Sequence, residues 1–239
     1  MSRTVAAPMD TDPLPDAQLR TSPSRWQRIV IGGGVLLTVL LVGVVAGVLL
    51  KLPGQPAPPP AADSIDVGFA QDMSVHHTQA VQMASWERDH TADPVLKLLA
   101  TDIEDTQHGQ VGRMQGWLDL WGAAALPLGR YMTWMADAPG HDHVESGSTE
   151  PGVTRMPGMA TSDDLNRLRK STGPEMDVVW LQLMLRHHEG GASMLAYAAD
   201  RAQLPQVRNL AAQMLSAQAA ESDYLRQLLA ARGGTPLPN

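Results

Sequence analysis

Residues 73–83 read Met-Ser-Val-His-His-Thr-Gln-Ala-Val-Gln-Met, and residues 184–194 read Met-Leu-Arg-His-His-Glu-Gly-Gly-Ala-Ser-Met. Met, His, His and Met recur at the same spacing in the two stretches, which lie 111 residues apart. Histidine nitrogen and methionine sulfur are both good ligands for copper. A duplication that keeps both residue types therefore predicts a metal-handling site built between two related halves.

The repeat continues beyond the motif, because Gln107 and Gln218 also share the offset, as do the prolines of Asp93-Pro94 and Leu204-Pro205. Each unit is about fifty residues long, 69–118 and 180–229, with a connection at 119–179. Two units are too few for a solenoid, which usually needs at least three repeats. We therefore expect two helical hairpins that close on each other as an all-α four-helix bundle.

Capping signals give the expected helix bounds. Prolines take the first position of three helices, and Asp63 or Ser64 can cap the other. The four main helices are expected from about 64 to 87, 94 to 121, 173 to 201 and 205 to 232, with a short helix from a cap at Thr161 or Ser162 to Thr172. No sustained β-branched alternation predicts a strand.

An uncharged run of 22 residues, Ile29 to Leu50, precedes the bundle and is long enough to span a bilayer as a single transmembrane helix. Arginines precede it and Lys51 alone follows closely, so residues 1–28 are expected in the cytoplasm as a disordered tail and the rest outside the cell membrane. The run is too long for the apolar core of a signal peptide, although Ala61-Ala62 leaves cleavage open. A Pro-rich linker at 51–62 then leads to the bundle at 63–232.

The composition of the chain limits the kinds of molecule that it can bind. The net charge of −7 and the pI near 5.5 argue against nucleic-acid binding. The chain has no cysteine, which excludes disulfides and thiolate metal sites and leaves imidazole, thioether and carboxylate ligands. The expected partners are a metal ion and, through residues 29–50, the lipid bilayer; a protein partner and the oligomeric state are left open.

On a helix with about 100° per residue, the motif residues of each copy fall within a stripe about 120° wide, the width that a core-facing helix presents. Ala80 and Gly191 at the stripe centres are small enough for the two motif helices to approach closely. Inward histidines are costly unless they are hydrogen-bonded or metal-bound. The predicted metal ligands are His76, His77, His187 and His188, with Met73 and Met184 one turn away as soft secondary ligands and Met83 and Met194 about two turns away.

Each ligand prediction has a structural alternative. Buried methionines commonly fill gaps in a core, and packing is favoured for Met83 and Met194. His141 and His143, together with nearby methionines such as Met156 and Met159, could form an auxiliary metal-capture loop, but a solvated loop is favoured.

Histidine with thioether favours copper, Cu(I) especially, because zinc does not need methionine. A di-iron carboxylate centre is rejected, because it needs a Glu-x-x-His motif on each of two helices and the chain has a single one, Glu87-Arg-Asp-His90, with no counterpart in the second repeat. A hydrolase function has little support, because the sequence has no Gly-x-Ser-x-Gly motif and no cysteine to act as a nucleophile.

The motif residues of both copies, with Gln107 to Trp117, Met156-Pro-Gly-Met159 and Met176-Asp177, resemble the bacterial "domain of unknown function 305" family, a ferritin-like four-helix group. The resemblance covers about 63–230 and implies an exported or membrane-anchored bundle. Some members are copper-binding, and the family often appears near copper-resistance functions. By the family pattern the positions to carry over are Met73, His76, His77, Met83, Met184, His187, His188 and Met194.

This sequence departs from the family pattern at two positions. Gln110 stands where a glutamate is expected, and Met176 stands where an aromatic residue is usual. Neither position touches the His-His motif, so the site prediction is unchanged.

The sequence thus predicts a membrane-anchored, extracytoplasmic copper-binding protein, Cu(I) or Cu(II), that serves sequestration, tolerance or delivery. Two alternatives stay open. One is a copper-dependent oxidoreductase, although a non-enzymatic role is favoured. The other is a partner-docking bundle in which the histidines form a buried polar layer without metal.

Overall fold

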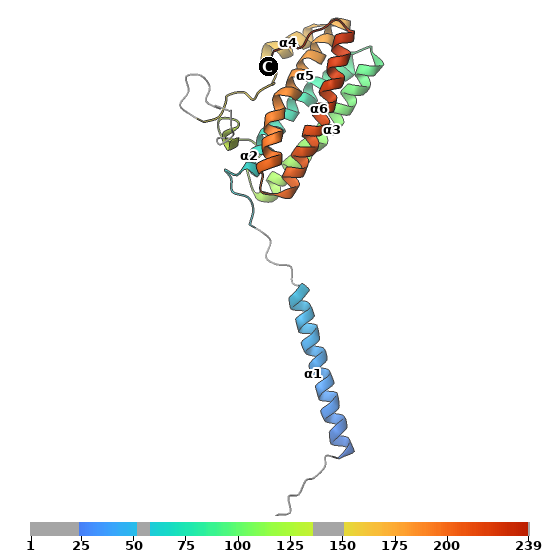
Figure 1. Cartoon of the computed structure of the whole chain (residues 1–239), viewed down its shortest axis with the longest axis vertical. Helices are drawn as coiled ribbons and strands as arrows, with labels where there is room; N and C mark the ends of the chain where they lie inside the picture. Colours follow the sequence, from blue (N-terminus) through green and yellow to red (C-terminus); the bar gives the residue numbers. More distant parts are fainter. Residues whose placement is uncertain (1–23, 52–57, 136–150, 239) are drawn as a thin grey trace, which may run out of the picture. The chain divides into compact units, whose positions relative to one another are not determined.

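The computed structural model describes residues 24–51, 58–135 and 151–238, and the predicted all-α class is confirmed over them (Figure 1). The order of elements is α1 Arg25–Lys51, α2 Ile65–His90, α3 Pro94–Trp121, the 3-10 helix η1 Thr133–Met135, α4 Ser162–Lys170, α5 Gly173–Arg201 and α6 Pro205–Ala231. One isolated bridge, between Tyr131 and Val153, is the single β-type pairing among the described residues.

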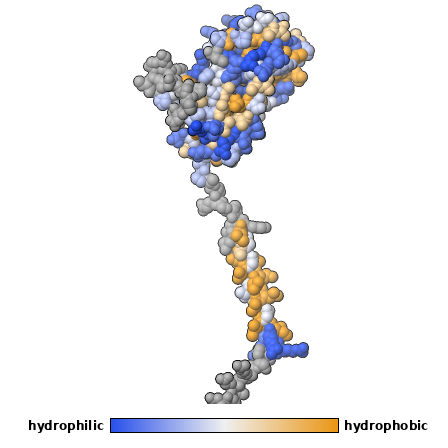
Figure 2. Space-filling view, viewed as in Figure 1, coloured by the Kyte–Doolittle hydropathy of each residue, from blue (hydrophilic) through white to orange (hydrophobic). Residues whose placement is uncertain are grey.

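Helix α1 stands as a unit of its own and is long and apolar enough to cross a membrane, although a signal sequence would pass the same test. Apolar side chains line the length of this helix, whereas the visible face of the bundle is mostly hydrophilic (Figure 2). The predicted uncharged run from Ile29 to Leu50 lies within α1.

Helix boundaries in the bundle follow the local signals. The Ser64 hydroxyl caps α2 by accepting from the amide of Val67, and the Asp93 carboxylate caps α3 by accepting from Val95. Thr161 and Asp164 form a reciprocal capping box on α4. Helix α2 ends at His90, three residues later than predicted, and the amide of Thr91 then closes its last turn on the Glu87 carbonyl.

Helix α6 begins after Leu204, which has no side-chain acceptor to cap the turn. The buried Asp66 of α2, in the other hairpin, holds this turn in place. Its two carboxylate oxygens accept from the amides of Gln203 at 3.0 Å and Leu204 at 2.9 Å. Asp177 holds the equivalent place in the second repeat, and its carboxylate accepts from the Thr91 hydroxyl at 2.8 Å in the turn before α3. Each hairpin therefore fixes the turn of the other.

The bundle consists of the hairpins α2–α3 and α5–α6, which meet along α2 and α5, the helices that carry the repeated motif (Figure 1). Its core is divided into two apolar clusters. One holds Phe69, Met73 and Met194 with neighbours from all four helices, and the other holds Met83, Trp180 and Met184. Along every helix, a buried polar segment separates the residues of one cluster from those of the other.

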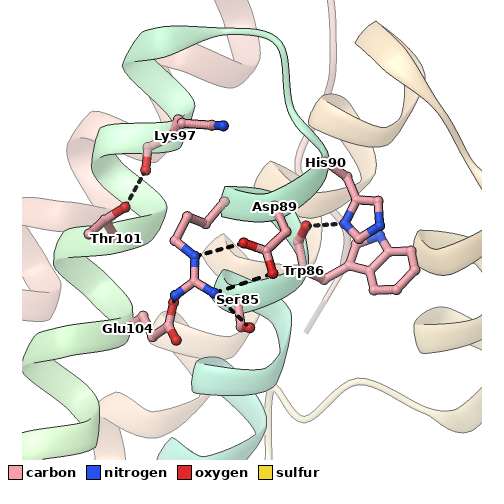
Figure 3. Close-up of polar contacts among 8 residues, drawn as sticks. Ser85, Trp86, Asp89, His90, Lys97, Thr101 and Glu104 are labelled. Atoms are coloured by element: carbon pink, nitrogen blue, oxygen red, sulfur yellow. Dashed lines mark hydrogen bonds and ion pairs between the residues drawn. The ribbon is translucent and has the colours of Figure 1, made fainter.

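A surface ion pair ties the end of α2 to α3. The guanidinium of Arg88 contacts the carboxylates of Glu104 and of the adjacent Asp89. Nearby, the His90 ring stacks on Trp86 with centroids 3.8 Å apart (Figure 3). Exposed ion pairs contribute at most about 1 kcal/mol to the stability of the fold. This contact therefore helps to orient α2 against α3 but stabilises the bundle little.

Candidate metal centre

All four motif histidines lie in one buried layer, the polar segment between the two apolar clusters. The rings of His76 and His187 face each other with centroids 3.8 Å apart. His77 and His188 flank this pair, with centroids 6.2 Å from His76 and 6.4 Å from His187 respectively. The two copies of the motif thus meet where α2 and α5 pack together.

Three of the four rings are held through Nε2 by an oxygen atom. His187 Nε2 lies 3.0 Å from the His76 carbonyl, His76 Nε2 lies 3.2 Å from the Pro157 carbonyl, and His188 Nε2 lies 2.8 Å from a Glu221 carboxylate oxygen. Because carbonyls and carboxylates only accept, each of these nitrogens carries the proton and donates it. The remaining lone pair of each neutral ring is then on Nδ1.

His77 is oriented more loosely, by a 3.5 Å contact between its Nε2 and the Gln218 side-chain amide. If the Gln218 amide is rotated by 180°, its oxygen faces Nε2 of His77. His77 then carries its proton on Nε2, as the other three rings do. No described residue makes a hydrogen bond to Nδ1 of His76, His77, His187 or His188, although all four atoms are buried. Four unpartnered imidazole nitrogens in one layer require an explanation, since buried polar atoms are normally satisfied.

Burial favours the neutral form of His76, His77 and His187. It lowers the pKa of His76 to about 4, against the opposing effect of its hydrogen bond to Pro157. Burial also lowers the pKa of His77 and His187 well below the ordinary value, with the neighbouring histidines adding to the effect. Neutral imidazole is the form that coordinates a metal ion.

Polar partners from α3 and α6 complete the layer, and sequence reasoning did not assign them a role. Gln107 and Gln218 are buried at equivalent positions of the repeat. Next to them, Gln110 lies against His77 in the first half, so the expectation that this position does not touch the His-His motif is wrong, and Glu221 accepts from His188 in the second. The shared offset of 111 residues was the available signal.

The motif methionines are all buried but do not form one group. Met73 and Met194 belong to the apolar cluster on one side of the histidine layer, and Met83 and Met184 belong to the cluster on the other side. This division follows from the chain order along the two helices, because α2 enters the layer from the side on which α5 leaves it. Each side of the layer therefore has one methionine from each copy.

The segment 156–160 lies over the layer. Gly158 has a positive φ of 77°, and a Cβ built on it would meet the Arg186 carbonyl at 2.5 Å. A Cβ on Gly190 would meet the Gly158 backbone at 2.4 Å, so both glycines are needed for this close approach. Met156 is buried in the first cluster and Met159 packs at its margin.

The other two histidines that the structure describes take no part in the layer. His90 and His108 are exposed on the bundle surface. His141 and His143 lie outside the described residues, so the predicted capture loop stays a prediction. Within the described ranges, no group of three or more His, Cys, Asp or Glu side chains is arranged to hold a metal ion. An ion in this layer would therefore draw on few imidazoles and need other donors, of which methionine sulfur is the nearest by sequence.

Comparison with known proteins places the bundle in a family. The family model of DUF305, a domain of unknown function, matches residues 66–229. A DUF305 protein of Streptomyces coelicolor, described as secreted, is 40% identical, and the match covers 75% of this chain and 100% of that one with a TM-score of 0.65. A DUF305 fragment from Deinococcus radiodurans is 27% identical, with coverage of 72% and 98% and a TM-score of 0.55.

Two further matches are weaker. The uncharacterized protein L153 of Acanthamoeba polyphaga mimivirus is 37% identical over 54 residues, which are 23% of this chain and 36% of that protein. CopM, solved in Cu(II)-bound, Cu(I)-bound, silver-bound and apo forms, is 20% identical in its Cu(II) form with a TM-score of 0.49 over 69% of this chain and 96% of CopM. At that distance nothing about the ligands of CopM transfers to this chain. On the family match and the Streptomyces relative, the chain belongs to the DUF305 family.

Proposed function

We propose that this protein binds copper ions, Cu(I) in particular, in the histidine layer between its two hairpins. The observation that carries the proposal is the set of four buried Nδ1 atoms without a hydrogen-bond partner among the described residues. Metal-ligating histidines characteristically donate their other ring N–H to a carbonyl or carboxylate. In His76, His187 and His188, Nε2 already donates to such an oxygen, and Nδ1 has no partner among the described residues.

The methionines favour Cu(I) over other ions. Thioether is a soft ligand that selects Cu(I), and each side of the layer has a pair of buried methionines beside it. Met73 and Met184, each one turn before its histidines, would add a sulfur ligand on opposite sides, whereas Met83 and Met194 would pack or serve as further donors. Cu(I) also accepts low coordination numbers, which suits a layer where no three imidazoles or carboxylates converge among the described residues.

The burial of the layer supports sequestration or delivery over catalysis. All four histidines are at most 1% exposed, so a bound ion would be shielded from oxygen and small reductants. The apolar helix α1, as a membrane anchor, would hold the bundle outside the cell membrane, where it would limit copper toxicity. A copper oxidoreductase would instead need an open coordination position next to substrate.

The test is copper affinity of the full-length chain in detergent, measured by competition with a chromophoric Cu(I) chelator. The matched variant replaces His76, His77, His187 and His188 by glutamine, which keeps a side-chain N–H donor but has no nitrogen lone pair. The control variant replaces the exposed His90 and His108 in the same way.

We expect tight binding in the parent and in the control, and loss of at least a hundredfold in affinity in the layer variant with the helical content retained. A folded parent that does not bind copper would leave the layer as a buried polar device for partner docking, and the proposal would be wrong. Oxygen consumption by the copper-loaded parent would instead favour the oxidoreductase.

A further inference from the structure

A cleft of about 510 Å³ opens between α5 and α6 on the surface of the bundle. His188 and Gln218, both buried members of the layer, line its inner part, and the exposed Ala219 lines its outer part. His188 keeps an unpartnered buried Nδ1 among the described residues. The cleft therefore leads from solvent to a histidine of the layer that has a nitrogen without a partner.

The mouth of this cleft is acidic. Glu189 and Asp223 line it, and the half-exposed Arg226 bridges them with contacts of 2.6 Å to each carboxylate. Glu221, which is not among the lining residues, has a side chain that is 28% exposed and accepts from the lining His188 at 2.8 Å. One guanidinium is thus set against two carboxylates at the mouth and a third beside it, and an excess of negative charge raises the local concentration of cations.

The first hairpin lacks these features at the equivalent positions of the repeat. The three charged residues of the mouth, Glu189, Asp223 and Arg226, correspond to Thr78, Gly112 and Gln115, and the neighbouring Glu221 corresponds to Gln110. A cleft of about 320 Å³ does lie on that side, but none of the four layer histidines lines it. The two halves share the layer, and the second half has a charged path that leads to it.

We propose that the α5–α6 cleft is the port through which a copper ion enters the histidine layer. Glu189 and Asp223 attract the ion to the mouth, and Nδ1 of His188 is the first imidazole nitrogen that it binds. The ion exchanges ligands without a change of oxidation state, and Nε2 of His188 keeps its proton and its hydrogen bond to Glu221. This inference rests on the proposed copper binding and adds the direction from which the ion arrives.

The port is tested by the rate at which the full-length chain in detergent takes Cu(I) from a chromophoric chelator, followed by stopped-flow absorbance. Ala219→Trp fills the outer part of the cleft, and His108→Trp places the same side chain at the equivalent exposed position of the first hairpin. We expect Ala219→Trp to slow loading at least tenfold with little change in equilibrium affinity, and His108→Trp to stay within twofold of the parent.

A second variant, Asp223→Asn, tests the negative charge of the mouth. It should slow loading severalfold and weaken the dependence of the rate on ionic strength, because one steering charge is lost. Equal loading rates in the parent and Ala219→Trp, or equal slowing by the two tryptophan variants, would overturn the port alone. A parent that takes up no Cu(I) at equilibrium would overturn the proposed function and the port with it.

Discussion

The rings of His76 and His187, equivalent residues of the two repeats, face each other with centroids 3.8 Å apart and planes tilted by 36°. The contact crosses the interface of the two hairpins, and His187 also donates to the backbone carbonyl of His76. Neither hairpin could form this arrangement by itself. The duplication therefore serves to build one layer from two copies of a motif, with Ala80 and the buried Gly191 allowing the approach: a Cβ on Gly191 would lie 3.0 Å from the His76 ring.

Gly190→Ala is expected to destabilise the bundle by about 1–3 kcal/mol, because its methyl group would overlap the backbone of Pro157 and Gly158 at 2.4–2.5 Å. The displaced segment would also lose the hydrogen bond between Pro157 and His76. Urea unfolding of the full-length chain in detergent measures the difference. Gly112→Ala, in the open on α3, is the control and should stabilise by about 0.5–1 kcal/mol. Equal effects of the two changes would contradict the close approach.

Glu87→Gln is expected to change the pH dependence of stability. Burial, with the negative charge of Asp177 adding and Arg232 opposing, raises the pKa of Glu87 from 4.5 to about 8. Between these two pH values the unfolded chain ionises Glu87 while the folded chain keeps it protonated, so stability falls as pH rises through this window. Glutamine stays neutral throughout and matches the protonated shape. The variant should therefore be about as stable as the parent at pH 4.5 and more stable at pH 8, by on the order of 2–4 kcal/mol.

Urea unfolding at pH 4.5, 6.5 and 8 checks this prediction. Because other groups, such as Asp93 near Glu87, titrate in both proteins, the difference in the free energy of unfolding between parent and variant at each pH reports mainly on Glu87. A difference that does not grow with pH would show that Glu87 ionises in the folded chain as it does in the unfolded one.

Helix ends and the histidine layer could be predicted from the sequence because their signals are local or repeated. Pro94 and Pro205 take the first turn of α3 and α6, and the starts and ends of α3 and α5 agree with the prediction. The inward direction of the histidines followed from helical periodicity, and their burial confirms it. These features depend on residues within one or two turns of each other.

Features that depend on how the hairpins dock were missed. Asp66 reaches across to hold the turn before α6, and the Pro157 carbonyl accepts from His76, but periodicity does not encode which distant backbone a polar side chain meets. The division of the methionines between two clusters likewise depends on α2 and α5 entering the layer from opposite sides. Asp66 and Asp177 share the 111-residue offset of the repeat, which was the one signal in the sequence that could have marked these contacts between the hairpins.

Asp72→Asn is expected to cost about 1–3 kcal/mol, since Asp72 joins α2 to the segment around η1. Its buried carboxylate accepts from the Met132 amide at 2.6 Å and from the Trp134 indole at 2.8 Å. Both bonds go to the same oxygen, Oδ2, so an asparagine can keep them through its Oδ1 but accepts them without the charge that strengthens them. Asp105→Asn, on the exposed face of α3, is the control and should stay within about 0.5 kcal/mol of the parent.

Near-UV circular dichroism should show whether the weaker acceptor loosens the Trp134 indole, which packs edge-on against Phe69. Unaltered stability and an unaltered spectrum in Asp72→Asn would mean that the charge of Asp72 adds nothing to the two hydrogen bonds.

Met73→Leu and Met184→Leu separate sulfur ligation from packing. Leucine is close to methionine in volume, so each change should alter the free energy of unfolding by less than about 1.5 kcal/mol. If the thioether binds Cu(I), each change should weaken Cu(I) affinity about tenfold or more, which is about 1.4 kcal/mol. Zinc affinity should not change, because zinc uses the histidines without thioether. The control is Met114→Leu with Met214→Leu, two buried methionines outside the motif.

Because Met73 and Met184 lie in different clusters on opposite sides of the histidine layer, their effects should combine additively in free energy. Competition titrations of the two single variants and the double variant measure this. Strong coupling between the two changes would mean that both sulfurs bind one ion, and the layer would then have to rearrange on loading. Full Cu(I) affinity in the double variant, with zinc bound as tightly as copper, would remove the reason to prefer copper and leave a site made by imidazole alone.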